Sequence, residues 1–180
     1  LTAAQILWVN LVEDGLPDIA LAFEPKEEGL MREPPRPKKT PILDLEMKVL
    51  IFIIGIFTDL GLLGLLYFLT KGLFHLHHIQ TVIFAALAVD SLFYVFSCRS
   101  LKKTFFHEHP FENKILNLTV VFGFLLLFMA IYLPFFQKFL GTHPLDMSEW
   151  FLVIVIGLVE IFAIEITKWI FIIKRKTVKI

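Results

Sequence analysis

The sequence predicts an all-α, polytopic membrane helix bundle with five transmembrane helices. Of its 180 residues, 57% are hydrophobic, more than the roughly one half that is usual in soluble domains, and the mean hydropathy is +0.74. Apolar runs of about 20 residues recur along the chain, long enough to cross a hydrocarbon core of roughly 30 Å. Because backbone groups in lipid must pair within their own segment, these runs are predicted to be helices and not strands.

Charge and cysteine content exclude several functional classes. Lys and Arg together number 17, as do Asp and Glu, so the formal net charge is zero, which argues against nucleic acid as a partner. The single cysteine excludes an internal disulfide and a cysteine-based metal cluster. The chain opens directly into an apolar helix pattern, with neither an initiator Met nor a signal-peptide pattern. We therefore expect it to be the C-terminal piece of a longer chain.

The predicted helices follow one another along the whole sequence. They are expected at residues 3–23, 47–70, 79–98, 114–136 and 148–173. The segment 24–46 is rich in proline and charge, so we expect an extended, solvated cytoplasmic loop with polyproline character. A plain linker and a docking strap for a cytoplasmic domain both remain open as its role.

The first helix is a poor membrane span by itself, because acidic residues and a helix breaker lie near its middle. A charged residue at a helix centre costs about 2.5–3.5 kcal/mol on insertion scales, and this helix carries Glu13 and Asp14. Pro17 lacks an N–H group and clashes with the carbonyl four residues earlier, and Gly15 lowers the helix propensity. The sequence therefore predicts a helix that is broken and locally unwound at Gly15–Pro17.

Four polar residues of the first helix follow the i, i+3, i+4, i+8 spacing and are expected to share one face: Asn10, Glu13, Asp14 and Asp18. With backbone carbonyls freed by the break, they would form an oxygen-rich site for a hard cation. Transporters use broken helices of this kind at ion sites. The alternative is a proline kink with neutralised carboxylates, but intramembrane acids are usually functional, so the ion site is the preferred hypothesis.

Later helices carry further charged residues. Asp90 lies in the middle of the third helix, and Asp59 in the middle of the second. For Asp59 we favour a hydrogen bond into the bundle, or a partner cation, over transport. In the last helix, Glu165 and Lys168 are three residues apart and are predicted to pair on one face, whereas Glu160 has no partner in the pattern.

Basic residues are concentrated in every second connection between the predicted helices. They gather before the second helix, between the third and fourth, and after the last: Lys26, Arg32, Arg36, Lys38, Lys39, Lys48, Arg99, Lys102, Lys103, Lys114, Lys174, Arg175, Lys176 and Lys179. The two opposite loops offer Lys71 and Lys138. By the positive-inside rule, an integral, multi-pass protein of the cell or plasma membrane with a cytoplasmic C-terminus is expected.

The stretch "LTAAQILWVNLVEDGLPDIALAFEP", with the following "MREPPRP", resembles the sixth membrane helix and loop of type II P-type ATPases, the cation pumps of the calcium and sodium–potassium kind. The later runs resemble helices seven to ten in hydropathy and spacing. The resemblance implies a transmembrane segment of an ATP-driven cation pump that contributes part of the intramembrane ion site. It implies that Asn10 and Asp14 are ion ligands and that Asp90 is the acidic ligand of the eighth helix. The alternative is a stand-alone structural or partner-binding membrane module that has lost transport.

Three positions depart from the calcium-pump pattern. Glu13 stands where Thr is common, Asp18 where the residue is small, and Asp90 where Glu is usual. The departures leave the cation open: calcium, another hard cation, or a cation exchanged for a counter-transported proton. The metal-ligand candidates are Asn10, Glu13, Asp14 and Asp90, and the secondary candidates are Asp18, Asp59 and Glu160.

The family's phosphorylated aspartate belongs to a "DKTGT" motif, which this sequence lacks, as it lacks a glycine-rich phosphate loop. We therefore expect no catalytic and no cofactor-binding residue in the chain itself. In family terms, ATP and magnesium act in cytoplasmic domains outside it. The expected partners are the lipid bilayer and the N-terminal helices and cytoplasmic domains of the same pump.

Overall fold

The computed structural model describes residues 1–25, 35, 41, 43, 45–49, 51–52, 55–71, 76–99 and 111–178. The described elements are helical, in the order α1 (Ala3–Trp8), the π-helix η1 (Val9–Asp14), α2 (Gly15–Leu21), α3 (Leu45–Val49), α4 (Gly55–Lys71), α5 (Leu76–Cys98), α6 (Lys114–Tyr132), α7 (Pro134–Leu140) and α8 (Met147–Val178). No strand occurs in these ranges. The prediction of an all-α membrane helix bundle is confirmed. Most of the predicted loop 24–46 lies outside the described residues.

Three helices of the described part are long and apolar enough to cross a membrane: α5, α6 and α8 over Met147–Ile173. The predicted first span is present as α1, η1 and α2 in succession. The predicted second span corresponds to α3 and the 17-residue α4, with residues 50, 53 and 54 between them outside the description.

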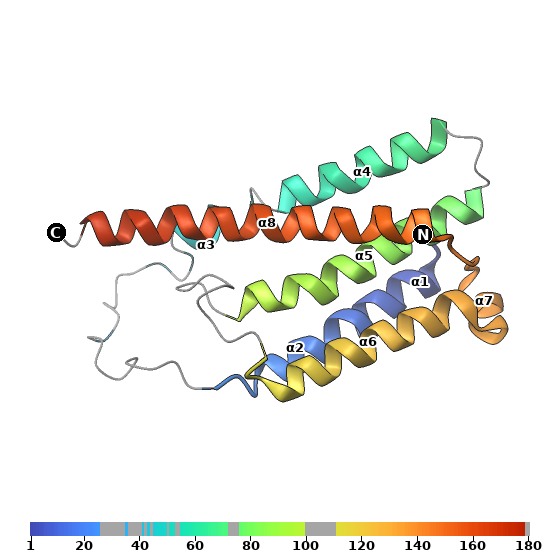
Figure 1. Cartoon of the computed structure of the whole chain (residues 1–180), viewed down its shortest axis with the longest axis horizontal. Helices are drawn as coiled ribbons and strands as arrows, with labels where there is room; N and C mark the ends of the chain where they lie inside the picture. Colours follow the sequence, from blue (N-terminus) through green and yellow to red (C-terminus); the bar gives the residue numbers. More distant parts are fainter. Residues whose placement is uncertain are drawn as a thin grey trace.

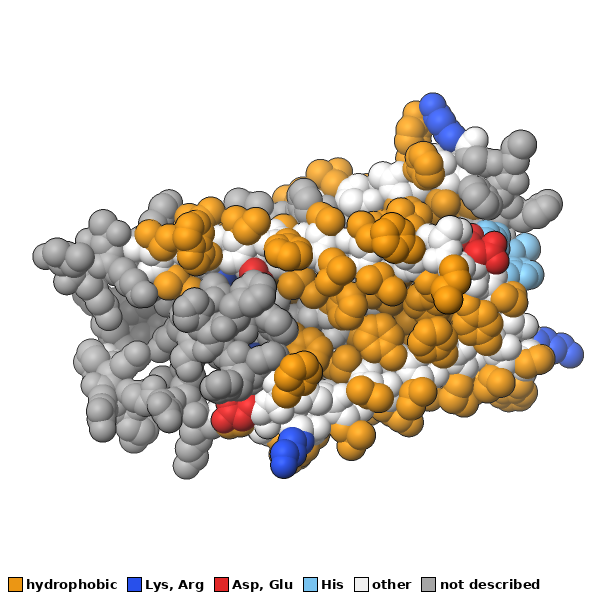
Figure 2. Space-filling view, in the orientation of Figure 1, with side chains coloured by type: hydrophobic (Ala, Val, Ile, Leu, Met, Phe, Trp, Pro, Cys, Tyr) orange, Lys and Arg blue, Asp and Glu red, His pale blue; other side chains and the backbone are white. Residues whose placement is uncertain are grey.

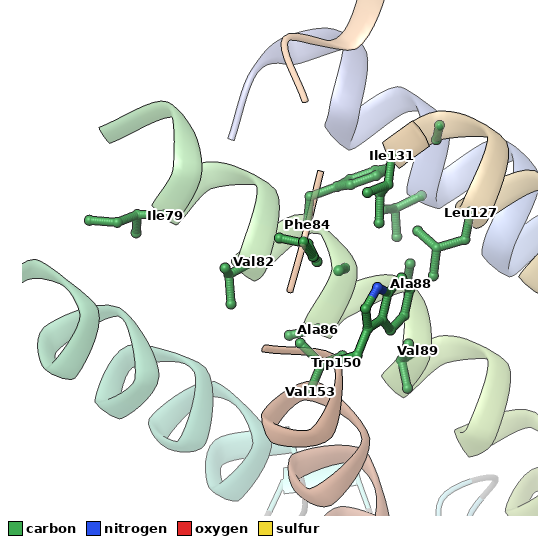
Figure 3. Close-up of a cluster of buried hydrophobic side chains, with 14 of the residues drawn as sticks. Ile79, Val82, Phe84, Ala86, Ala88, Val89, Leu127, Ile131, Trp150 and Val153 are labelled. Atoms are coloured by element: carbon green, nitrogen blue, oxygen red, sulfur yellow. The ribbon is translucent and has the colours of Figure 1, made fainter. Parts of the chain in front are cut away.

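Helix α5 is the centre of the bundle. It packs against α8, α4, α6 and η1, and these long helices run roughly along one axis (Figure 1). Side chains of α5 such as Val82, Phe84 and Val89 are fully buried, and Val153 of α8 and Leu127 of α6 close around them (Figure 3). In contrast, hydrophobic side chains cover much of the outer surface, and charged side chains lie towards its ends (Figure 2). An apolar outer surface of this kind suits a hydrocarbon environment.

The first helix is widened just before the residues at which local unwinding was predicted. Val9–Asp14 form a π-helix, and Gly15 keeps right-handed helical angles (φ −62°, ψ −39°) before α2 continues. Pro17 cannot donate to the Glu13 carbonyl and its ring would clash with it. A π-turn relieves that conflict because it bonds residues five apart while the chain stays helical. The predicted local unwinding at Gly15–Pro17 was therefore wrong: these residues are the first of the α-helix α2, and the helix changes type just before them.

The predicted helix 114–136 is divided in the structure. Helix α6 ends at Tyr132, Leu133 is extended (φ −83°, ψ 127°), and α7 starts at Pro134. Proline disfavours helical angles in the preceding residue and suits the first position of a new helix. Gly141 then ends α7 with a left-handed φ of 71°. The sequence expectation was wrong at this point because it read the apolar run without regard to Pro134.

Candidate cation site

Asp90 is the carboxyl group that connects the acidic residues of three helices. Asp90 of α5 is close enough to interact electrostatically with Asp14 of η1 and with Glu160 of α8. A Cβ atom placed on Gly61 of α4 would lie 3.7 Å from Glu160 Oε1, so the α4 backbone borders the same place. The structure thus brings together two of the predicted ligands, Asp14 and Asp90, and the secondary candidate Glu160.

Glu160 is the most enclosed member of this group. Only 3% of its surface is exposed, and neither of its carboxyl oxygens has a hydrogen-bond partner of ordinary geometry among the described residues. Buried polar groups are normally paired, because leaving one unpaired costs about 1–3 kcal/mol or more. A ligand or a proton bound to Glu160 would remove this cost.

Glu13 is close enough to Asp14 to interact with it electrostatically, but its carboxyl group lies against α6. It is fully buried, and its Oε1 accepts a hydrogen bond from Trp8 Nε1 at 3.2 Å. A Cβ atom placed on Gly123 of α6 would lie 3.1 Å from Glu13 Oε2, which has no hydrogen-bond partner in the described part of the chain. Glu13 is therefore directed towards α6, whereas Asp14 approaches Asp90 of α5.

The expectation that four polar residues share one face of the first helix was wrong. Asn10 and Asp18 are exposed and Glu13 is buried. Asp18 approaches Tyr94 and Cys98 of α5 closely enough to interact with them electrostatically. The reason is the π-helix, since the i, i+3, i+4, i+8 rule holds for an α-helix of 3.6 residues per turn.

The remaining secondary candidate, Asp59, has an exposed side chain on α4. It does not face the described bundle, so the expected inward hydrogen bond is not formed there. Nowhere in the described ranges do three or more His, Cys, Asp or Glu side chains form a group that could hold a metal ion. A calcium ion takes 6–8 oxygen ligands, more than the described carboxyl groups bring together.

A buried ion pair holds α8 to α5 further along the bundle. Lys168 Nζ lies 3.0 Å from Glu165 Oε1, which confirms the predicted pair. Ser97 of α5 donates a hydrogen bond from Oγ to the same Glu165 oxygen at 3.1 Å, and Lys168 Nζ donates to the Ser97 carbonyl. With their charges paired and hydrogen-bonded, these two residues have a structural role.

At the end of α2, one carboxylate joins three elements that are far apart in sequence. Glu24 accepts hydrogen bonds from Arg99 Nε at 2.8 Å and from Asn113 Nδ2 at 2.8 Å. Asn113 also donates to the Ala20 carbonyl and caps the start of α6. Burial raises the pKa of Glu24, but the hydrogen bonds from Arg99 and Asn113 and the charge of Arg99 outweigh it, so the pKa is lowered overall. We call these three side chains the Glu24 clamp.

Sequence reasoning missed the Glu24 clamp, and it missed the role of Trp8 and Gly123 around Glu13. Asn113 could have been recognised as a helix cap from its residue type, but its partner Glu24 is 89 residues away. Trp8 and Glu13 are five residues apart, a spacing that brings side chains together on a π-turn and not on an α-helix.

Comparison with known proteins decides the family. Residues 1–170 match the family described as "Cation transporting ATPase, C-terminus". The chain belongs to this family. It is the C-terminal membrane region of a P-type cation-transporting ATPase, as the resemblance implied.

Named relatives agree with this membership of the cation-transporting ATPases. A calcium-transporting ATPase of Bacillus subtilis is 35% identical over 166 residues, covering 90% of this chain and 18% of the relative. Calcium-transporting ATPase 1 of Bacillus cereus is 30% identical, covering 91% of this chain and 20% of the relative. Calcium-transporting ATPase 1 of Saccharomyces cerevisiae is 31% identical, covering 87% and 17%. The chain thus spans about a fifth of the length of these relatives.

Proposed function

We propose that this membrane region supplies part of the intramembrane ion site of an ATP-driven cation pump. The approach of Asp14 and Asp90 carries the proposal. Two carboxylates that interact through a medium of low dielectric repel each other, and a cation between them removes that cost. Carboxylate oxygens are the ligands that hard cations such as calcium prefer. Because the relatives cited above are named as calcium-transporting ATPases, calcium is the first cation to test.

In this proposal the predicted ligands have different tasks. Asp14 and Asp90 hold the cation from two helices, and the exposed Asn10 completes the shell on the side that faces other helices of the pump. Glu13 is held by Trp8 and directed towards α6, so it would reach the cation only if η1 turned. Such a turn would give the two states of the pump different affinities for the cation, which alternating access requires. ATP and magnesium act in the cytoplasmic domains of the complete pump.

The test is the substitution Asp14→Asn in the complete pump. It removes one charge and keeps the shape of the side chain, so we expect calcium to activate phosphoenzyme formation at least about tenfold less effectively, equivalent to about 1.4 kcal/mol of binding free energy. Phosphorylation is measured against free calcium concentration.

Asp146→Asn serves as the matched control, because Asp146 is exposed in the segment before α8. This control is expected to keep the calcium dependence of the wild type. An unchanged calcium dependence in Asp14→Asn would refute the proposed site and favour a membrane module that does not take part in ion binding.

A further inference from the structure

Two histidine side chains meet at one end of the bundle, away from the proposed cation site. His77 lies in the first turn of α5, and His143 lies in the segment between α7 and α8. Their ring centroids are 6.2 Å apart, and both side chains are exposed. Histidine side chains gather at this end of the molecule, where α5 and α8 begin (Figure 2). The two residues are far apart in the sequence, so the fold brings them together.

One buried side chain holds the backbone at both histidines. Thr81 of α5 is fully buried. Its hydroxyl donates a hydrogen bond to the His77 carbonyl at 3.0 Å and accepts one from the His143 N–H at 3.0 Å. With the backbone fixed at both residues, little entropy is lost when the two rings bind the same ion.

The separation of the two rings suits a shared transition metal ion. A zinc ion bound at about 2.0–2.1 Å by a nitrogen of each imidazole lies roughly 3.2 Å from each ring centroid, so two rings can share it at centroid separations up to about 6.4 Å. The observed 6.2 Å is within this reach, and the exposed rings can turn about their side-chain bonds towards a tetrahedral arrangement. Zinc accepts imidazole nitrogen as a ligand, whereas calcium takes oxygen ligands.

The neighbouring side chains are engaged elsewhere. His78 Nε2 pairs with Glu149 Oε1 of α8, and Glu149 Oε2 accepts a hydrogen bond from the Asp146 N–H at 2.7 Å. Within the ranges that the structure describes, no third His, Cys, Asp or Glu completes a metal-binding group. Water would therefore fill the other positions of a tetrahedral ion, as it does in zinc sites that keep an open position.

We propose that His77 and His143 form a two-histidine zinc site at the end of the bundle where α5 and α8 begin. Bound zinc links the start of α5 to the segment before α8, next to the pair of His78 and Glu149. The positive-inside rule predicts that this end lies outside the cytoplasm. The site shares no residue with the proposed cation site, so it does not depend on the proposed function.

The experiment titrates the purified complete pump with zinc alone, in competition with a fluorescent zinc chelator and without calcium. We expect the wild type to bind one zinc ion that His77→Gln and His143→Gln each bind at least about tenfold more weakly, since loss of a group that only orients a zinc ligand already costs about 10–100-fold. The variant with both substitutions should bind zinc about as weakly as either single variant, because the first lost ligand already removes the shared site.

His78→Gln is the matched control, since it makes the same change at the next residue of α5, whose ring pairs with Glu149. It should keep the zinc affinity of the wild type. Unchanged zinc binding in either single variant, or an equal loss in His78→Gln, would overturn the site. A further loss in the double variant would also overturn it, because the two histidines would then bind separate, adventitious ions. The calcium dependence of Asp14→Asn reports on the cation site independently of these results.

Discussion

Gly123 is the residue of α6 that gives Glu13 room at the helix interface. A Cβ atom at this position would lie 2.5 Å from Leu92 Cδ2 and 3.1 Å from Glu13 Oε2. Leu92 is fully buried in α5 and Glu13 is fully buried in η1, so an added Cβ atom would force a buried side chain to shift. The absence of a side chain at Gly123 therefore allows a carboxyl group, held by Trp8, to sit between three helices.

Gly123→Ala is expected to lower the free energy of unfolding by about 1–3 kcal/mol, the usual cost of an extra methyl group in a well-packed core. The measurement is the thermal unfolding midpoint of the purified pump in detergent. Gly64→Ala is the control, because nothing lies within 4 Å of a Cβ atom at Gly64, and its effect should stay within about 0.5 kcal/mol. Equal midpoints for the two variants would show that α6 does not pack against Glu13 and Leu92 in this way.

The first helical span is fixed at both ends by polar contacts, while its middle is widened. At its start, the Thr2 hydroxyl accepts from the Gln5 backbone N–H and the Gln5 side chain accepts from the Thr2 N–H, which together form a capping box. At its end, the Glu24 clamp ties it to α5 and α6. A helix held at both ends can change its internal turn type without losing its place, as the proposed turning of η1 requires.

The Glu24 clamp predicts a pH dependence of stability. The pKa of Glu24 is lowered from the ordinary value of 4.5 in the folded state. The clamp therefore stabilises the fold fully at pH values above 4.5, and this contribution is lost as the pH falls through the lower folded-state pKa. We expect Glu24→Gln to unfold at a lower temperature than the wild type at neutral pH, and the difference should shrink between roughly pH 6 and pH 3.

Thermal unfolding scans of the wild type and Glu24→Gln across that range check this prediction. Glu112→Gln is a suitable control, because Glu112 is exposed close to the clamp residue Asn113. A difference between wild type and Glu24→Gln that stays constant down to the lowest pH would contradict a charge-dependent clamp.

At the scale of the whole molecule, the helices place two exposed acidic residues at opposite ends of the bundle. Glu112 precedes α6 and Asp146 precedes α8, and the two helices start from opposite ends (Figure 1). The positive-inside rule predicts that the start of α6 lies in the cytoplasm and the start of α8 outside.

Single cysteines test this orientation in a pump whose other cysteines, including Cys98, are replaced by serine. A membrane-impermeant maleimide added from outside is expected to label Asp146→Cys and to leave Glu112→Cys unlabelled until the membrane is opened. The labelled fraction is read from the mass shift of the protein. Labelling of Glu112→Cys in sealed cells would reverse the proposed orientation.

The sequence by itself determined the features that depend on composition and on neighbours along the chain. Apolar runs long enough to cross a bilayer predict membrane helices however these helices pack. The reason is that backbone N–H and C=O groups in lipid must form their hydrogen bonds within the segment. The pairing of Glu165 and Lys168 followed from their spacing on a regular helix. The stretch around Asn10 to Pro17 was specific enough to indicate the family, which the match over residues 1–170 confirmed.

Only the tertiary structure decided which acidic residues meet. Helical spacing gives the direction of a side chain on an ideal α-helix, and the π-helix before Pro17 changes that direction, so Glu13 reaches Gly123 while Asp14 approaches Asp90. Asp90 and Glu160 are 70 residues apart in the sequence, and the distance between them depends on how α5 packs against α8. The sequence of either helix alone does not reveal this packing. The physical reason is that sequence periodicity describes one helix at a time, whereas a charge is stabilised or opposed by whatever other helices bring next to it.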